Sequence, residues 1–390
     1  MISAIVVILI SSALSTAIIS AVAGALGWKG SLRSFGVAFA VLTVASVVAA
    51  INLTTGTIPQ KVASEIAFEI FNGDRGYQLS DTFLVYSGVT FPAFVFTNVW
   101  FAAIGTSIGA WVSAIYILFD KVAPGHRLAL FAPAIFNFAI FALRDTVFGV
   151  LLGALTYEMS RDSKRRPLVM LLIFVPLAIT RPESAVAIGG AYAFSVYRSS
   201  DKSSPLRVLR LITLAGAAIG AIQLIPRALG INRTFGILSF PSELAEFFAT
   251  RATKNERIDP DETNSNILGG RLVQIPFVAR FPIQIAAFFV LPFPFEIRGV
   301  ALALAFLDSL LFIKLSRKMW VIANQTEKTL LVAYIASVSF FAANYGNLLR
   351  LRMPVYFMFL AVFAAHHLSE RRAGRLRSVK RLPLEVTSGR

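Results

Sequence analysis

The sequence predicts an all-α fold, a polytopic bundle of transmembrane helices. Two observations come from composition: 56% of the residues are hydrophobic and only 15% are charged, whereas soluble domains carry about 25% charged residues. A third is that apolar stretches recur from residue 2 to residue 367 and leave no room for a large soluble domain. We therefore expect one membrane domain over residues 1–370, followed by a disordered basic cytoplasmic tail at 371–390.

A helix that crosses a bilayer needs about 20 apolar residues, and about eleven segments approach this pattern. No positive segment precedes residues 2–25, so we expect a retained first helix there and not a cleaved signal peptide. The apolar segment 273–297 is broken by four prolines and Arg280, which predicts a re-entrant or interfacial pair of half-helices on the outer side. The expected spans are 2–25, 34–51, 97–119, 128–143, 146–159, 168–180, 184–197, 208–226, 299–314, 328–345 and 353–367.

Basic clusters predict the orientation of this bundle. Lys and Arg concentrate in cytoplasmic loops of membrane proteins, and one alternation of the spans places every basic cluster on the same side. It puts the N-terminus outside and the C-terminus inside, with long outer loops at 52–96 and 227–298. The net charge of +16 is thus explained by topology, without nucleic acid as a partner. The basic clusters are Lys29/Arg33, Lys121/Arg127, Arg161 to Arg166, Arg198 to Arg210, Lys314 to Lys318 and Arg371 to Arg381.

Several kinds of chemistry are excluded or unsupported. The chain has no Cys, which excludes disulfides, thiol catalysis and thiolate metal sites. Phosphate-binding loops of the GxxxxGKS type and HExxH and GxSxG motifs do not occur in the sequence. We expect no metal and no cofactor.

The predicted outer side carries twelve Arg but only two Lys. Arg has a planar fork that binds phosphate through two parallel hydrogen bonds, whereas charge balance alone would be served as well by Lys. This predicts an outer polyanion site. The alternative is that each Arg reaches lipid headgroups or pairs with a nearby carboxylate. The candidate diphosphate-binding residues are Arg144, Arg181, Arg280, Arg350 and Arg352, with Tyr345 and Asn347 from the segment AANYGNLLRLRMPVYFMF.

Three carboxylates are candidate catalytic bases. Asp145 and Glu183 lie at two charged tips, Arg144-Asp145 and Arg181-Pro182-Glu183, each between two short apolar segments. A carboxylate there could take the proton of a sugar hydroxyl while the neighbouring Arg stabilises a departing diphosphate. A structural salt bridge between the two hairpins is the alternative, and both roles can coexist. Asp81, in the first long outer loop, is the third candidate, and helix capping is its alternative role.

One further carboxylate, Asp308, lies inside an expected span. An ionisable residue at membrane depth is a functional hypothesis by default. One such residue does not define a proton relay.

Three segments resemble polysaccharide-repeat polymerases of the Wzy type and related membrane glycosyltransferases. They are ALRDTVFGVLLGAL followed by ITRPESAV, then VLPFPFEIRG, then NYGNLLRLRMPVY, and they cover about the last two-thirds of the chain. The resemblance implies a GT-C-like bundle in the bacterial cytoplasmic membrane. It implies that the enzyme joins undecaprenyl-diphosphate-linked repeat units on the outer face, with outer Arg residues on the diphosphates. It also implies a chain-length regulator protein as a partner.

Two alternatives stay open. One is a GT-C glycosyltransferase that uses a polyprenyl-phosphate sugar, with Asp74 or Asp81 at its catalytic centre. The other is a transporter or flippase of lipid-linked anionic glycans, although such proteins often contain inverted repeats and none is visible here. Polysaccharide ligases of the same broad group use an outer His, and this chain places its three His inside or at the inner boundary. This argues against a ligase.

Overall fold

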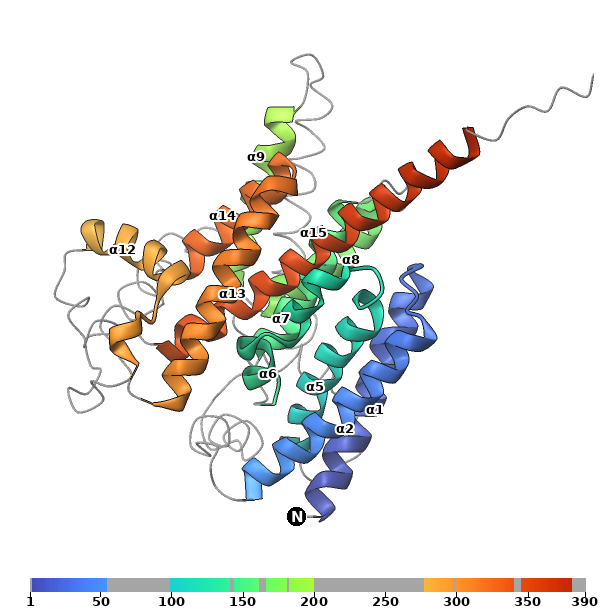
Figure 1. Ribbon diagram of the computed structural model, residues 1–390, viewed down its shortest axis with the longest axis vertical. Helices are drawn as coiled ribbons and strands as arrows, with labels where there is room; N and C mark the ends of the chain where they lie inside the picture. Colours follow the sequence, from blue (N-terminus) through green and yellow to red (C-terminus); the bar gives the residue numbers. More distant parts are fainter. Residues whose placement is uncertain are drawn as a thin grey trace, which may run out of the picture.

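A computed structural model of the protein describes residues 2–54, 99–140, 144–160, 166–180, 182–199, 277–297, 299–339 and 345–380. Every regular element in these ranges is a helix (Figure 1), so the all-α prediction is confirmed for this part of the chain. The elements are α1 (Ile2–Ala25), α2 (Leu32–Thr54), α5 (Val99–Leu118), the 3-10 helix η2 (Pro124–Phe131), α6 (Pro133–Ala139), α7 (Arg144–Met159), α8 (Arg166–Thr180), α9 (Pro182–Ser199), α12 (Phe277–Val290), the 3-10 helix η5 (Pro294–Glu296), α13 (Val300–Ile322), α14 (Gln325–Ser339) and α15 (Tyr345–Lys380).

Among the described residues, three helices are long and apolar enough to cross a membrane: Ala4–Ala25, Leu32–Asn52 and Leu348–Arg371. Shorter apolar helices cover Ile104–Leu118, Pro167–Ala178, Ser184–Ser195 and Phe281–Val290. Length and composition therefore indicate a membrane protein. The expected span 208–226 lies outside the described residues. So do the long outer loops 52–96 and 227–298, apart from residues 52–54 and 277–297.

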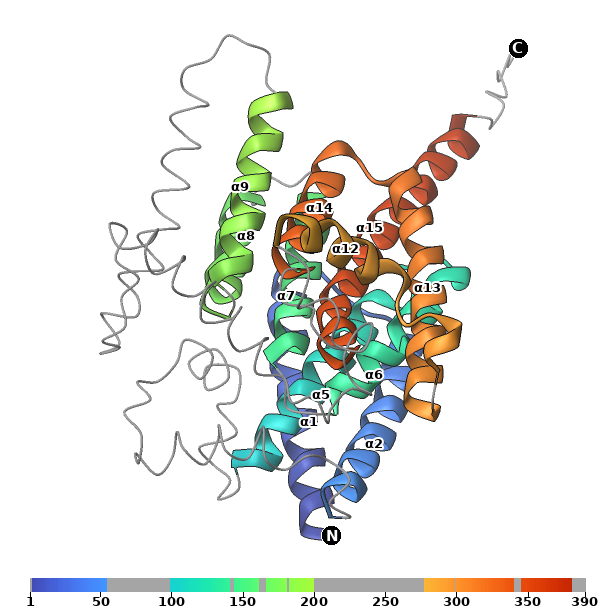
Figure 2. The ribbon, with the colours of Figure 1, turned by 90° about the vertical axis from the view of Figure 1, so that its left-hand side faces the viewer.

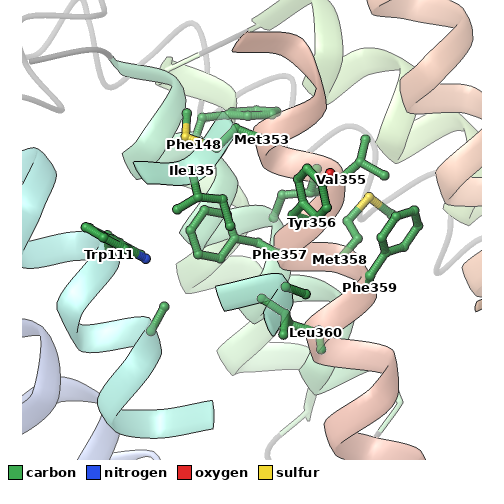
Figure 3. Packing of buried hydrophobic residues seen from close by; sticks show 14 of the residues in the cluster. Trp111, Ile135, Phe148, Met353, Val355, Tyr356, Phe357, Met358, Phe359 and Leu360 are labelled. Atoms are coloured by element: carbon green, nitrogen blue, oxygen red, sulfur yellow. The ribbon is translucent and has the colours of Figure 1, made fainter. Parts of the chain in front are cut away.

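The central element is α15, which packs against α6, α7, α13 and α14. In its most apolar stretch 83% of the residues are buried inside the protein, whereas the corresponding share of the peripheral helix α1 is 22%. Figure 3 shows Phe357 of α15 next to Ile135 on one side of the helix, with Met358 and Phe359 on the opposite side, and all four side chains are buried. A helix that is apolar all round is buried on all sides, and this one forms the core.

Helices α1, α2 and α5 pack together at one side of the core, as both ribbon views show (Figure 2). Small residues bring α1 and α5 into close contact. A Cβ atom added at Gly105 of α5 would lie 2.9 Å from the carbonyl oxygen of Ile8. Close backbone approach of this kind is a common basis of helix packing in membranes, where hydrophobicity gives no drive toward association. The outward face of α1 carries exposed apolar side chains at every fourth residue: Ile2, Val6, Ile10, Leu14, Ile18 and Val22.

Small residues also bring α7 and α15 into close contact. Gly149 and Gly153, four residues apart on α7, lie directly against α15. A Cβ atom at Gly153 would lie 2.9 Å from the carbonyl oxygen of Phe357 and 3.0 Å from its Cβ. The two helices can touch along this face only because neither glycine has a side chain.

The expected span 128–143 and the expected pair of half-helices in 273–297 differ from the observed helices. Helix α13 also continues past the expected end at residue 314 to Ile322, so the basic cluster Lys314 to Lys318 is helical. The expected span 128–143 is interrupted at Ala132, which has an extended conformation between η2 and α6. Pro133 has no N–H to donate and occupies the first position of α6, where none is needed. The chain therefore turns there, and α6 is only seven residues long. In segment 273–297 the first half-helix is α12, but the second is reduced to the three residues of η5.

Helix α15 is much longer than the expected span 353–367. It begins at Tyr345 and continues to Lys380, so Pro354 lies inside the helix and residues 371–380 are helical, contrary to the expectation of a disordered tail. Arg350 and Arg352 precede the expected span 353–367, in which Pro354 is close to the start. They lie instead in the second turn of a continuous helix.

The glycine face of α7 gives a stability prediction. Replacement of Gly153 by Ala should lower the thermal unfolding midpoint of the detergent-purified protein, because the new methyl group meets backbone atoms of α15 that cannot move locally. The matched control is Gly36→Ala in α2, where no atom lies within 4 Å of the added Cβ. There the gain in helix propensity, about 0.8–1.0 kcal/mol for Gly to Ala, should leave the midpoint unchanged or higher. Equal effects of the two substitutions would contradict the packing described.

Candidate active site

The first charged pair lies between the N-terminal turns of α7 and α15. Asp145 is in the first turn of α7, where its negative charge is favoured by the helix dipole. The Nε atom of Arg350 lies 3.2 Å from Oδ2 of Asp145. The Asp145 side chain is 1% exposed and that of Arg350 is 30% exposed. The pair therefore has a buried carboxylate behind a guanidinium that partly faces the surface.

The parallel packing of α7 and α15 produces this pair. Gly149 and Gly153 bring the two helices together, and one turn above them Thr146 donates to the sulfur of Met353 at 3.6 Å. Asp145 and Arg350 are the next facing residues toward the N-terminal ends. Two of the sequence-predicted site residues, more than two hundred positions apart, are thus brought together.

A second charged pair lies deeper, around Arg352. Its guanidinium is fully buried, with Nη1 lying 3.5 Å from Oδ2 of Asp308. Nε donates to the carbonyl of Phe288 at 2.7 Å, and Nη2 donates to the carbonyl of Leu291 at 2.8 Å. Nη1 also donates to the hydroxyl of Ser309 at 2.6 Å. Each of the three nitrogens therefore has a protein acceptor.

The partner carboxylate, Asp308, is held from another direction. Its Oδ1 accepts the backbone N–H of Ala134, at the start of α6, at 3.1 Å. The hydroxyl of Tyr356 donates to the Asp308 carbonyl at 3.0 Å. The guanidinium carbon of Arg352 also lies 5.3 Å from the ring centre of Phe312, within the range of a cation–π contact. The network joins α6, α12, α13 and α15.

Arg352 was expected to bind diphosphate, and its surroundings lead to a different assignment. A guanidinium that is fully buried and bonded to Asp308, Ser309 and two carbonyls has no surface to offer a lipid-linked anion. We therefore give Arg352 a structural role. Arg350, two residues earlier and facing α7, keeps the role of candidate anion ligand.

The remaining candidates are described only in part. Arg144 is the first residue of α7, Glu183 the second of α9, and Arg280 lies in α12. Tyr345 and Asn347 are in the first turn of α15. The structure describes the backbone of these five residues but not their side chains. Arg181 and Asp81 lie outside the described residues.

Sequence reasoning identified Asp308 but not its partner. The signal was present, because Asp308 is the one acidic residue of the apolar segment 300–315 and Arg352 stands at the start of another apolar segment. Two opposite charges in separate apolar helices favour pairing, since an unpaired charge in the bilayer is costly.

The described part of the chain is a helical protein of the membrane class. It has three helices able to cross a bilayer and two charged pairs between its helices, Asp145–Arg350 and Asp308–Arg352. Within the described ranges, no group of three or more His, Asp or Glu residues could hold a metal ion. Comparison with protein-family models, curated proteins and solved structures finds no match to this chain.

The buried network gives a second stability prediction. Arg352→Leu leaves Asp308 buried without its cation, and breaking a buried pair in this way costs about 3–5 kcal/mol. The double variant Arg352→Leu/Asp308→Leu removes both charges and should recover most of that loss. Denaturant unfolding of the purified protein, followed by helical circular dichroism, measures both. Equal stability of the single and double variants would contradict the pairing.

Proposed function

We propose that the protein is a glycosyltransferase of the bacterial cytoplasmic membrane that joins undecaprenyl-diphosphate-linked oligosaccharide repeat units on the outer face. The observation that carries this proposal is the Asp145–Arg350 pair. It combines a candidate base from the predicted tip Arg144-Asp145 with a cation suited to diphosphate from the segment AANYGNLLRLRMPVYFMF. The three resembling segments include both residues.

The topology proposed is that of about eleven spans, with the N-terminus outside and the C-terminus inside. It is supported by contacts between the basic ends of different helices. Nζ of Lys318 at the end of α13 lies 3.3 Å from Nε2 of His126 in η2, and the His126 ring stacks on Phe363 of α15. In both ribbon views the C-terminal ends of α9, α13 and α15 lie toward the same end of the molecule, at the top of Figures 1 and 2.

The depth of the Asp145–Arg350 pair also fits an outer site. Arg350 and Phe363 are thirteen residues apart on α15, which corresponds to about 20 Å along a helix at 1.5 Å per residue. The hydrocarbon core of a bilayer is about 30 Å thick. If the basic ends mark the inner boundary, the pair lies in the outer part of the membrane but below its surface. The diphosphate of a lipid-linked glycan lies just outside the hydrocarbon, about 10 Å beyond the pair on these numbers, so it would reach Arg350 only through a cavity open to the outer side.

The reaction requires two groups at such a site. A hydroxyl of the acceptor sugar attacks the anomeric carbon of the donor, and the bond from that carbon to the diphosphate oxygen breaks. The hydroxyl proton passes to the carboxylate of Asp145, and the bond electrons pass to the undecaprenyl diphosphate. The guanidinium of Arg350 stabilises the charge that develops on the leaving oxygen. Glu183 and Asp81 remain candidates for the base, and Arg144, Arg181 and Arg280 for further diphosphate contacts.

The Asp145–Arg350 pair gives the activity prediction. Purified protein in nanodiscs, supplied with lipid-diphosphate repeat units, should yield longer glycans on electrophoresis. Asp145→Asn keeps the shape of the side chain but removes the base, so glycan formation should fall by about 10²–10⁴-fold. Arg350→Gln should reduce it by about 10²–10³-fold, a typical cost of losing one oxyanion-stabilising donor. Arg317→Gln, at an exposed site on α13, is the control and should leave glycan formation unchanged.

Three outcomes would lead away from this proposal. If the wild-type protein leaves product length unchanged although the substrate pool is active, the polymerase proposal is wrong. Loss of sugar transfer in Asp81→Asn but not in Asp145→Asn favours a glycosyltransferase that uses a polyprenyl-phosphate sugar. Movement of the lipid-linked glycan across proteoliposomes without bond formation favours a transporter.

The orientation has a separate test that uses the absence of Cys from the chain. Single cysteines are introduced as Lys29→Cys, between α1 and α2, and Phe295→Cys, in η5, both at exposed positions. In intact spheroplasts a membrane-impermeant maleimide should label residue 295 and should label residue 29 only after permeabilisation. The reverse pattern would overturn the proposed orientation.

A further inference from the structure

A cluster of basic side chains forms at the end of the bundle opposite the Asp145–Arg350 pair. Lys314 and Lys318, four residues apart on one face of α13, are both exposed. His126 of η2 lies 3.3 Å from Lys318, measured between Nε2 and Nζ. The third element is α15, which contributes His367 and the ring of Phe363. Helix η2 contacts both α13 and α15, so the three elements meet here.

The charges in this cluster have one sign. The pKa of His126 is held below its ordinary value, first by partial burial and then by the positive charges of Lys318, His367 and Lys314. Its Nε2 can therefore accept a hydrogen bond from the ammonium of Lys318. Two Lys at positions i and i+4 of a helix repel each other, and an anion bound between them would relieve this repulsion.

Two described acidic residues, Asp120 and Glu370, are bonded to groups outside the cluster. Asp120 accepts hydrogen bonds from Ser31 and Ser34 and lies 3.8 Å from Arg127. The hydrogen bond from Ser31 is the main reason that the pKa of Asp120 is lowered. Glu370 lies 3.2 Å from His366 within α15. The described acids thus pair with other groups, and the lysines of the cluster keep a net positive charge.

An apolar stripe on α13 leads to the same lysines. Val300, Leu304, Leu307 and Leu310 are exposed large hydrophobic residues. At 100° per residue, Leu304 and Leu307 lie on the same face of the helix as Lys314 and Lys318. Leu307 and Lys318 are eleven residues apart, or about 16 Å along the axis, close to half of the roughly 30 Å hydrocarbon thickness.

An aromatic side chain marks the level of the lysines. Trp320 is half exposed two residues after Lys318, and the ammonium of Lys328 lies 5.5 Å from the centre of its ring. Trp is enriched where the membrane meets water. The lysines of α13 therefore stand at headgroup level, and the leucines stand at the level of acyl chains.

We propose that Lys314, Lys318, His126 and His367 form a binding site for the phosphate of an anionic phospholipid, whose acyl chain lies along Leu304 and Leu307 of α13. Basic pockets between membrane helices are suited to such headgroups. The site joins α13, η2 and α15, and α13 and α15 also carry the Asp308–Arg352 pair. A bound lipid would hold the ends of these elements together without entering the candidate active site.

The test is native mass spectrometry of the full chain, purified in detergent and mixed with equal amounts of dioleoyl phosphatidylglycerol and dioleoyl phosphatidylcholine. The wild-type protein should retain phosphatidylglycerol in preference to phosphatidylcholine. Each Lys near anionic lipid contributes about 1 kcal/mol, so Lys314→Gln/Lys318→Gln should reduce retention by about 30-fold. Lys29→Gln/Arg371→Gln removes two exposed charges from the same end and should not change it.

Two results would overturn the proposal. One is equal retention of the two lipids by the wild-type protein, a comparison that needs no variant. The other is equal loss in the two double variants, which would mean that only the total charge matters. A second measurement distinguishes a lipid from free phosphate: short-chain phosphatidylglycerol should raise the thermal unfolding midpoint, and the same concentration of inorganic phosphate should not. An equal rise with inorganic phosphate would contradict a lipid site. Glycan formation is measured separately, so neither result depends on the proposed enzymatic activity.

Discussion

The arrangement of the helices depends on the ion pair between Arg352 and Asp308. A charge in the interior of a membrane protein is costly unless it is paired and hydrogen-bonded, and here each charge is held by several partners. Three nitrogens of Arg352 reach two backbone carbonyls of the α12 segment and a hydroxyl of α13, while Asp308 accepts the first N–H group of α6. Because these bonds have no substitute in hydrocarbon, they define how four helices are placed relative to one another.

The candidate active site depends on this placement. With α15 held on one side by Arg352, its other side presents Arg350 to α7, and the glycine face of α7 permits close approach there. Asp145 and Arg350 then meet at a distance set by backbone packing and not by loops. A site built on two packed helices can keep a base and a cation in a constant geometry, which a catalytic step requires. The structural and functional interpretations of this salt bridge are compatible, since the pair would orient the same groups that react.

The sequence predicts several helices and individual residues of the candidate site, but not how the helices pack, and there are physical reasons for both. Hydropathy and length located α1, α2, α5 and α7 to within a few residues, because lipid imposes a minimum apolar length. A charged tip indicated Asp145 and the outer excess of Arg indicated Arg350, but neither pattern shows that the two residues touch, because one sequence does not tell which helix faces which. Pro354 was misleading: a proline is usual at a helix start, yet inside a buried helix its neighbours compensate for the lost bond. Gly149 and Gly153 carried a packing signal at spacing four that hydropathy does not register.

The position of Pro354 has an additional consequence. A helical residue normally donates its N–H to the carbonyl four positions earlier, and for residue 354 that carbonyl belongs to Arg350. Proline has no N–H, so the regular bond to this oxygen is not formed. Arg350 thus brings both a positive side chain and a backbone acceptor, released from its helical bond, to the same turn of α15. The acceptor has no charge and does not titrate. If the proposed function is correct and a sugar hydroxyl is oriented here beside a diphosphate, the helix would supply a cation and a neutral acceptor from one residue.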